Sequence, residues 1–222
     1  LYASAGDGAS FNNVDYGQYG GTNAGFQRNP CGDPPGGVGG SMTPPTAEGG
    51  ALRSQSLRRP AGEPVTLDGT IIRIDPDTGL ALPDNPLINH ANTNAQRIIA
   101  YGLRNPFRLA VRPGTNEIWI GDVGWNTWEE LNRISNPTDA LVENFGWPCY
   151  EGNNRQSGYA GANRNICENL YAEGTSAITA PYYAYNHSAK VISTETCPTG
   201  SSSVAGVTFQ FGAGSAYPAA YQ

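Results

Sequence analysis

Three short apolar runs in the middle of the chain, separated by tight turn signals, constrain the fold more than any other feature. The runs are FRLAVRP, EIWIGDV and EELNRI, and the segments between them are PGTN and GWNTW. Strands of this length, with turns about ten residues apart, are typical of antiparallel meanders. We therefore predict that residues 101–134 form a β-meander.

Similar apolar runs occur on both sides of this meander. The sequence predicts a buried strand at LYASAG and further strands at GTIIRIDPDTG, RIIAYGL, YYAYN and VAGVTFQF. Helix signals are weak, and we expect no more than a turn or two, at LNRISN and ICENLYAEG. Short strands, glycine turns and few helices favour a sandwich or a propeller, and the internal repeats are too weak to choose between them.

Residues 9–68 differ from the rest of the chain. Glycine, asparagine, proline and serine dominate this segment, which lacks apolar periodicity. We predict a long loop or insertion within a single domain spanning residues 1–222. Loops of such length are often functional, and the alternative is a surface insertion without chemistry. The chain also begins inside an apparent strand, so we expect it to be a fragment of a longer protein or a processed form.

The charge balance excludes several classes of partner. The 222 residues include 19 acidic and 13 basic side chains, which give a net charge of −6. A chain of this charge has no basic face for phosphates, so nucleic acid is not an expected partner. No apolar run approaches the roughly 20 residues that a membrane-spanning helix needs.

The four cysteines favour disulfides over a metal site. They are widely spaced, without a CxxC pair, which argues against zinc. Few cysteines, a single lysine and an acidic composition fit a secreted protein, extracellular or periplasmic, with one or two disulfides. Cys149 and Cys167 are the favoured pair because they close a short loop. Cys31 with Cys197 is a second candidate, and either pair has the alternative of bonding outside this chain.

Four sequence blocks together resemble the glucose/sorbosone dehydrogenase family. They are LYASAGDG, GTIIRIDPDTG with the following DNP, the long block GLRNPFRLAVRPGTNEIWIGDVGWNTWEELNRI, and NFGWPCYEG, in the family's order. Residues 9–68 lie outside this resemblance. It implies an all-β, six-bladed propeller of antiparallel four-stranded blades, of which this chain covers only about the central blades.

The resemblance also implies an activity. Members of this family oxidise the anomeric hydroxyl of aldose sugars and pass a hydride to pyrroloquinoline quinone (PQQ), which is held by Ca²⁺. A sugar is therefore the expected small-molecule partner, and the sequence does not specify the electron acceptor.

Arg104 and Asn105 are the candidate PQQ-binding residues. They stand at the end of an apolar strand, directly before Pro106. An arginine fork pairs well with carboxylate and quinone oxygens and stabilises the negative charge that develops on reduction. The two residues match the family's PQQ-contacting pair. Without the resemblance, an arginine and an amide that tie down a loop would be the simpler interpretation.

The candidate metal site lies in the loop that follows EIWI. Calcium binds hard oxygens, many of them backbone carbonyls. By position in the family, the carbonyls of Gly124 and Trp125 are the expected ligands, and Trp125 stands where other members can have proline. Asp122 is expected to add a carboxylate, and its alternative role is to cap a turn.

The catalytic base is not expected in this chain. The family's base is a histidine upstream of the LYASAGDG block, and Glu129 matches a carboxylate that orients it. The alternative for Glu129 is a solvated strand edge. His90 and His187 match no family position and are predicted to lie at the surface, and Asp7 either lines the cleft or caps a turn. We therefore expect this chain alone to be inactive.

A second function class stays open from the sequence. Propellers of the same family also act as non-catalytic modules that bind carbohydrate or protein, and Tyr182, Tyr183 and Tyr185 suit stacking on a sugar ring. The presence of Arg104 and Asn105 favours the enzyme.

Overall fold

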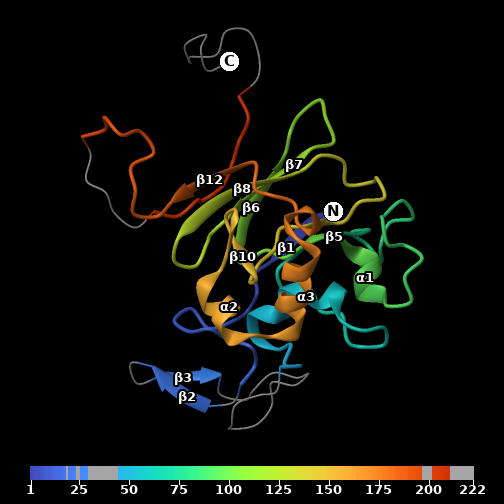
Figure 1. Cartoon of the computed structure of the whole chain (residues 1–222). Helices are drawn as coiled ribbons and strands as arrows, with labels where there is room; N and C mark the ends of the chain where they lie inside the picture. The colour runs from blue at the N-terminus through green and yellow to red at the C-terminus, as the bar shows by residue number, and fades with distance from the viewer. Residues whose placement is uncertain (19, 24–25, 30–44, 197–201, 211–222) are drawn as a thin grey trace.

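The computed structural model describes residues 1–18, 20–23, 26–29, 45–196 and 202–210 (Figure 1). The strands are β1 (Tyr2–Ala5), β2 (Gly20–Asn23), β3 (Phe26–Asn29), β4 (Thr70–Arg73), β5 (Ile98–Tyr101), β6 (Pro106–Val111), β7 (Ile118–Asp122), β8 (Trp128–Ile134), β9 (Glu143–Asn144), β10 (Tyr150–Glu151), β11 (Asn154–Arg155) and β12 (Tyr183–Asn186). The helical segments are η1 (Gly50–Arg58), α1 (Thr93–Arg97), α2 (Ser157–Ala162), α3 (Asn165–Glu173) and η2 (Thr175–Ala177).

The predicted meander is confirmed as part of a four-stranded sheet. Its strand order is β12–β8–β7–β6, and every neighbouring pair is antiparallel. The central strand β7 is buried along its whole length, as its apolar run predicts. In Figure 1 this sheet lies above α2 and α3.

A second four-stranded sheet has the order β1–β4–β5–β9. It departs from the expected antiparallel blade because β5 and β9 are parallel. Strand β1 is confirmed, but it is an edge strand and partly exposed rather than buried. The described strands do not close into a ring, so the six-bladed propeller stays a prediction.

One apolar core joins the two sheets. Side chains of β4 and β5 pack there against side chains of β7 and β8, namely Ile71, Ile99, Ile118, Ile120 and Ile134, all fully buried. Burying such a side chain stabilises the fold by about 1.5–3 kcal/mol, so these isoleucines dominate the packing of the sheets.

The turn or two of helix predicted at ICENLYAEG is confirmed, but helical segments also occur where none was expected. The segment ICENLYAEG forms α3, which buries Ile166 and Leu170 one turn apart, whereas the first residues of LNRISN belong to β8. Within the predicted loop 9–68, η1 is an ordered helical segment that buries Leu52. These helices depend on burial against distant parts of the chain, and such contacts leave little local signal.

The strand predicted at VAGVTFQF was also wrong for its described residues, 204–210. The Val204 amide donates to the Glu129 carboxylate at 2.7 Å rather than to a neighbouring strand. The alternating apolar pattern is present, but in the described residues this segment pairs with no strand.

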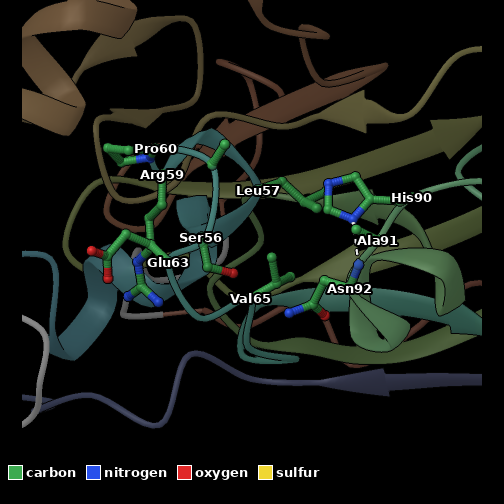
Figure 2. Close-up of a pocket in the computed structure, with 11 residues that line it drawn as sticks. Ser56, Leu57, Arg59, Pro60, Glu63, Val65, His90, Ala91 and Asn92 are labelled. Carbon is green, nitrogen blue, oxygen red and sulfur yellow. Dashed lines mark hydrogen bonds between the residues drawn. The ribbon is translucent and has the colours of Figure 1, made fainter.

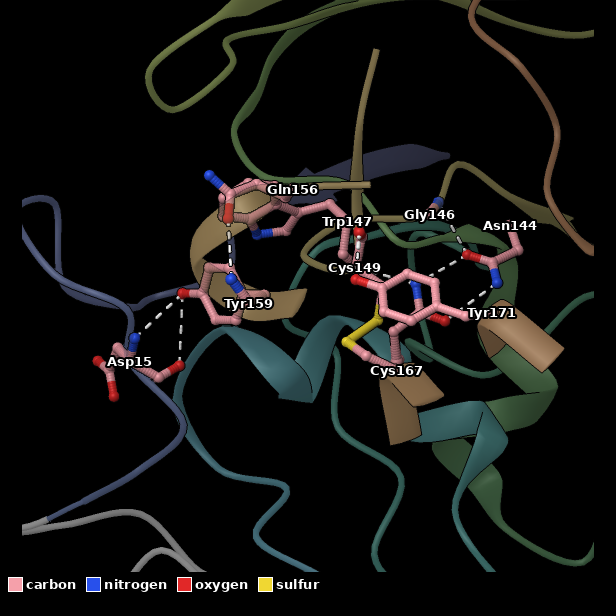
Figure 3. The surroundings of a disulfide bond; sticks show 10 residues. Asp15, Asn144, Gly146, Trp147, Cys149, Gln156, Tyr159, Cys167 and Tyr171 are labelled. Carbon is pink, nitrogen blue, oxygen red and sulfur yellow. Dashed lines mark hydrogen bonds between the residues drawn. A yellow bond between two sulfur atoms is a disulfide. The ribbon is translucent and has the colours of Figure 1, made fainter. Parts of the chain in front are cut away.

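The predicted disulfide between Cys149 and Cys167 is confirmed (Figure 3). It links the residue before β10 to α3. Cys31 and Cys197 both lie outside the described residues. None of the helices in the described ranges combines the length and the apolar character needed to cross a membrane.

Candidate functional site

Arg104 is buried where β5 leads into β6, and it faces the loop after β7. It is 9 % exposed, and its Nη1 atom donates to the carbonyl oxygens of Val123 and Gly124 at 3.0 and 2.7 Å. The guanidinium also lies over the rings of Phe11 and Trp147, 5.7 and 5.8 Å from their centroids. These contacts hold a permanent positive charge in one place.

The strand-end carboxylate of Asp122 fixes the backbone of the Arg104–Asn105 pair. Its two oxygens accept the amides of Arg104 and Asn105 at 3.1 and 2.7 Å. Burial raises the pKa of Asp122, although these amides and the Arg104 charge act in the opposite direction. In the described contacts the Asp122 carboxylate therefore caps the turn at residues 104–105. Capping a turn was the alternative to its predicted role as a metal ligand.

Arg104 and Asn105 line a cavity of about 240 Å³ together with Asp7 and Phe11. Asp7 also closes the local turn, because its Oδ1 atom accepts the Ala9 amide at 3.0 Å, while Oδ2 accepts the Trp147 indole N–H at 2.8 Å. Burial raises the pKa of Asp7, against the effect of these two hydrogen bonds. Both roles proposed for Asp7 are thus met by one carboxylate.

The expected metal loop is shaped by a residue that the sequence did not single out. The amides of residues 125–128 all donate to Glu151 Oε1, at 2.8–3.1 Å. Trp125 packs against Trp147 and Tyr159, and its indole N–H donates to the Phe11 carbonyl at 2.6 Å. Only the NFGWPCYEG block pointed to this region, and nothing in it distinguished Glu151.

Two successive carbonyls of this loop converge on Arg104. They belong to Val123 and Gly124, whereas the predicted calcium ligands are the carbonyls of Gly124 and Trp125. Among the described residues, no group of three or more histidine, cysteine or acidic side chains is arranged to hold a metal ion.

Glu129 is fully buried and faces a histidine of this chain. His187 Nδ1 lies 3.1 Å from Glu129 Oε1 and 3.0 Å from the Ser202 carbonyl oxygen. Burial raises the pKa of Glu129, while the Val204 amide and His187 act in the opposite direction. The prediction that His187 lies at the surface was wrong, because its side chain is only 12 % exposed. The contact spans β8 and the end of β12, so neither local sequence reveals it.

A second cavity, of about 250 Å³, shares no residue with the Arg104 cavity (Figure 2). His90 borders it and is exposed, as predicted, and its Nδ1 atom accepts the Asn92 amide at 3.0 Å. Arg59 lies on the other side of this cavity and donates to the backbone carbonyls of Pro64 and Glu48. No candidate site residue lies here.

Two curated relatives share part of this chain. The aldose sugar dehydrogenase YliI of Escherichia coli is 32% identical over 98 residues, which cover 44% of this chain and 24% of that protein. The uncharacterized protein slr1608 of Synechocystis is 34% identical over 109 residues, which cover 49% of this chain and 24% of that protein. The matched part of the chain thus spans about a quarter of the length of these relatives.

Solved structures give partial matches as well. The PQQ-bound aldose sugar dehydrogenase of Streptomyces coelicolor matches with 26% identity and a TM-score of 0.38, over 55% of this chain and 27% of that one. The soluble aldose sugar dehydrogenase of E. coli, in its apo form, matches with 25% identity and a TM-score of 0.42, over 62% of this chain and 34% of that one.

The family match is more extensive. The sequence profile of the glucose/sorbosone dehydrogenase family matches residues 49–205. This range starts inside the segment 9–68, which was expected to lie wholly outside the family resemblance, and it includes Arg104, Asn105 and the loop after β7. The chain belongs to the glucose/sorbosone dehydrogenase family.

Proposed function

We propose that the protein containing this chain is a PQQ-dependent oxidoreductase that oxidises the anomeric hydroxyl of aldose sugars. The observation that carries the proposal is the buried Arg104 guanidinium, which borders a cavity beside the exposed Asn105. The family match and the name of the E. coli relative support sugar oxidation. A six-bladed propeller, of which this chain forms the central blades, is part of the same proposal.

PQQ, when bound, supplies a quinone that accepts two electrons in the form of a hydride. Arg104 contributes a fixed positive charge that offsets the negative charge growing on a quinone oxygen. Because Asp122 and the loop carbonyls already hold Arg104, little reorganisation is needed when that charge develops. Asn105 adds an amide that can donate to the cofactor or accept from it.

The described residues fit a calcium ion poorly. The Gly124 carbonyl is occupied by Arg104, and both Asp122 oxygens accept backbone amides. A calcium ion at Gly124 would have to share that oxygen with a guanidinium, which is also positively charged. These contacts therefore do not support the calcium role proposed for Gly124 and Asp122, and they do not involve the carbonyl of Trp125, the third proposed ligand.

Glu129 is the proposed carboxylate that orients the catalytic base. Its Oε1 atom faces His187, so a histidine from another part of the protein would have to share or replace this contact. We also propose that the protein is exported from the cytoplasm, which the disulfide between Cys149 and Cys167 supports.

The proposal is tested on the full-length protein with PQQ and Ca²⁺ added. We expect dye reduction with at least one of a panel of aldoses, and about a 100-fold loss of turnover in Arg104→Ala, comparable to removing one charge-stabilising donor. Arg112→Ala is the matched control, because Arg112 pairs with Glu117 on the same sheet but outside the cavity.

If the protein is instead a non-catalytic module that binds carbohydrate or protein, the same experiments should give the opposite results. Absence of dye reduction with every aldose, together with PQQ titrations that show no heat, would reject the enzyme. Measuring sugar binding to the same sample would then test the non-catalytic alternative.

A further inference from the structure

The peptide group between Gly124 and Trp125 lies between two side chains of opposite charge. Its carbonyl accepts Arg104 Nη1 at 2.7 Å, and its N–H donates to Glu151 Oε1 at 2.8 Å. In a planar trans peptide the C=O and N–H bonds point in opposite directions. Rotation of this single peptide would therefore break the contacts on both sides.

Glu151 binds more than this one amide. Its Oε1 atom also accepts the amides of Asn126, Thr127 and Trp128 at 3.0, 3.0 and 3.1 Å. Successive amides that converge on one point form a nest for an anion, and hydrogen bonds to a charged acceptor are about twice as strong as neutral ones. Glu151 is 4 % exposed, so this nest is shielded from solvent.

The hairpin that carries Glu151 is itself anchored. The Cys149 carbonyl accepts the Gln156 amide at 2.9 Å and the Tyr171 hydroxyl at 2.7 Å, and Cys149 is bonded to Cys167 (Figure 3). The carboxylate therefore reaches the loop from a backbone that is fixed independently of it.

We propose that Glu151 is a positioning residue for the Arg104 site. It fixes the Gly124–Trp125 peptide so that the Gly124 carbonyl faces Arg104, and this contact holds the guanidinium at the cavity. Glu151 does not line that cavity, so it acts through the loop. Its role toward PQQ rests on the proposed function, whereas its role toward the loop does not.

Hydrogen exchange of the cofactor-free, full-length protein tests the role toward the loop. In Glu151→Ala we expect the amides of residues 125–128 to exchange about tenfold faster, since each loses a charged acceptor. Sodium formate should restore their protection by entering the nest, and neutral formamide should not. The control is Glu168→Ala, which removes an exposed carboxylate of α3 and should leave these amides unchanged.

Glu151→Gln keeps the inference testable if the alanine variant does not fold. It preserves the size of the side chain and removes its charge, so we expect about threefold faster exchange at the same amides with the Tm retained. Unchanged exchange at residues 125–128, or exchange that formate does not slow, would overturn the inference.

Calorimetry with PQQ tests the link to the Arg104 site. We expect Glu151→Ala to raise the Kd for PQQ about tenfold, and formate to reverse this effect, as the loss of one charged hydrogen bond predicts. A variant with exposed loop amides and wild-type PQQ affinity would contradict the link. If the wild-type protein binds no PQQ, the proposed function fails, and the exchange experiment still decides the role of Glu151.

Discussion

The loop of residues 123–128 has two sides, which are held by opposite charges from different parts of the chain. On one side the carbonyls of Val123 and Gly124 face Arg104, at the border of an open cavity. On the other side the amides of residues 125–128 face Glu151, which the β10–β11 hairpin carries. Charge–dipole contacts thus hold its backbone from both sides.

The two supports differ in how they are anchored. Arg104 is held by its neighbours in the sheet, since Asp122 accepts its amide and stands at the end of β7. Glu151 is held by a hairpin that the disulfide links to α3. The cation side therefore depends on strand pairing, and the anion side depends on a covalent link.

Gly124→Ala should break both sides at once and have the largest effect. A Cβ atom at this position would lie 1.6 Å from the Trp128 carbonyl oxygen, and that carbonyl belongs to the backbone. We expect a loss of about 4 kcal/mol in the free energy of unfolding, from steric overlap that the loop cannot relieve without leaving Arg104 or Glu151. Urea unfolding measures this loss.

Gly161→Ala is the matched control for this prediction. Nothing lies within 4 Å of a Cβ atom at Gly161, which belongs to α2. We expect a gain of up to about 1 kcal/mol, because alanine favours a helix over glycine. Equal effects of the two substitutions would contradict the steric argument.

Removing the disulfide should affect the anion side more than the cation side. The double variant Cys149→Ser/Cys167→Ser frees a link between residues 18 apart in sequence, and we expect a loss of about 3 kcal/mol in the free energy of unfolding. Hydrogen exchange should quicken at the amides of residues 125–128 and change little at the Arg104 amide. Equal changes at both sites would show that the two supports are not independent.

The sequence brought the residues of the cation side together because they are local, while their roles toward PQQ and calcium stay predictions. Arg104, Asn105 and Asp122 lie within one meander whose short strands are separated by turns that glycine marks. The sequence did not predict the anion side because the groups that bind Glu151 are backbone amides, which nearly every residue type supplies. Glu151 lies more than 20 residues beyond them along the chain.

The same reasoning explains the fold predictions that failed. Segment η1 buries polar residues, and Gln55 is satisfied by Asn144 and the Trp147 carbonyl, partners that no local pattern reveals. His187 was placed at the surface because the carboxylate it faces belongs to another strand. Local periodicity predicts that a strand exists, as at β1 and β12, but it names the partner strand only where that strand is near in sequence, as in β6–β8.

The pH dependence of stability should report on Glu130, which lies next to residues of both sides. This buried residue faces Asp122 across β7 and β8, and its Oε1 atom accepts the Gly152 amide. Burial raises the pKa of Glu130 above its ordinary value of 4.5, and the charges of Asp122 and Glu151 raise it further. The folded state then holds this proton more tightly than the unfolded state, so the contribution is present at low pH and is lost as the pH rises.

We expect the wild-type protein to lose about 2 kcal/mol of stability between pH 5 and pH 9 through this group, and Glu130→Gln to flatten the profile. The variant should fold, because the Gly152 amide keeps an acceptor and a flip of the Asn132 side-chain amide, which now donates to Glu130 Oε2, brings its buried Oδ1 to the new N–H donor. Urea unfolding across this range measures the slope, with Glu168→Gln as the exposed control. An identical slope in wild type and Glu130→Gln would contradict the assignment.

The smallest predicted effect concerns the residue shared by both sides. Trp125 supplies one of the amides to Glu151, while its indole N–H donates to the Phe11 carbonyl, near the ring over which Arg104 lies. Trp125→Phe keeps the amide and most of the aromatic packing but removes that donor. We expect a loss of about 1 kcal/mol, the usual net value of one hydrogen bond.

Exchange at the Trp125 position should stay slow in Trp125→Phe, because the backbone amide and Glu151 are untouched. Thermal unfolding gives the stability and hydrogen exchange gives the amide. If the loop loses protection in this variant, aromatic packing of Trp125 with Trp147 and Tyr159 would be what orders it. The contacts of opposite charge on the two sides of the Gly124–Trp125 peptide would then result from an order that the packing imposes, and would not be what orders the loop.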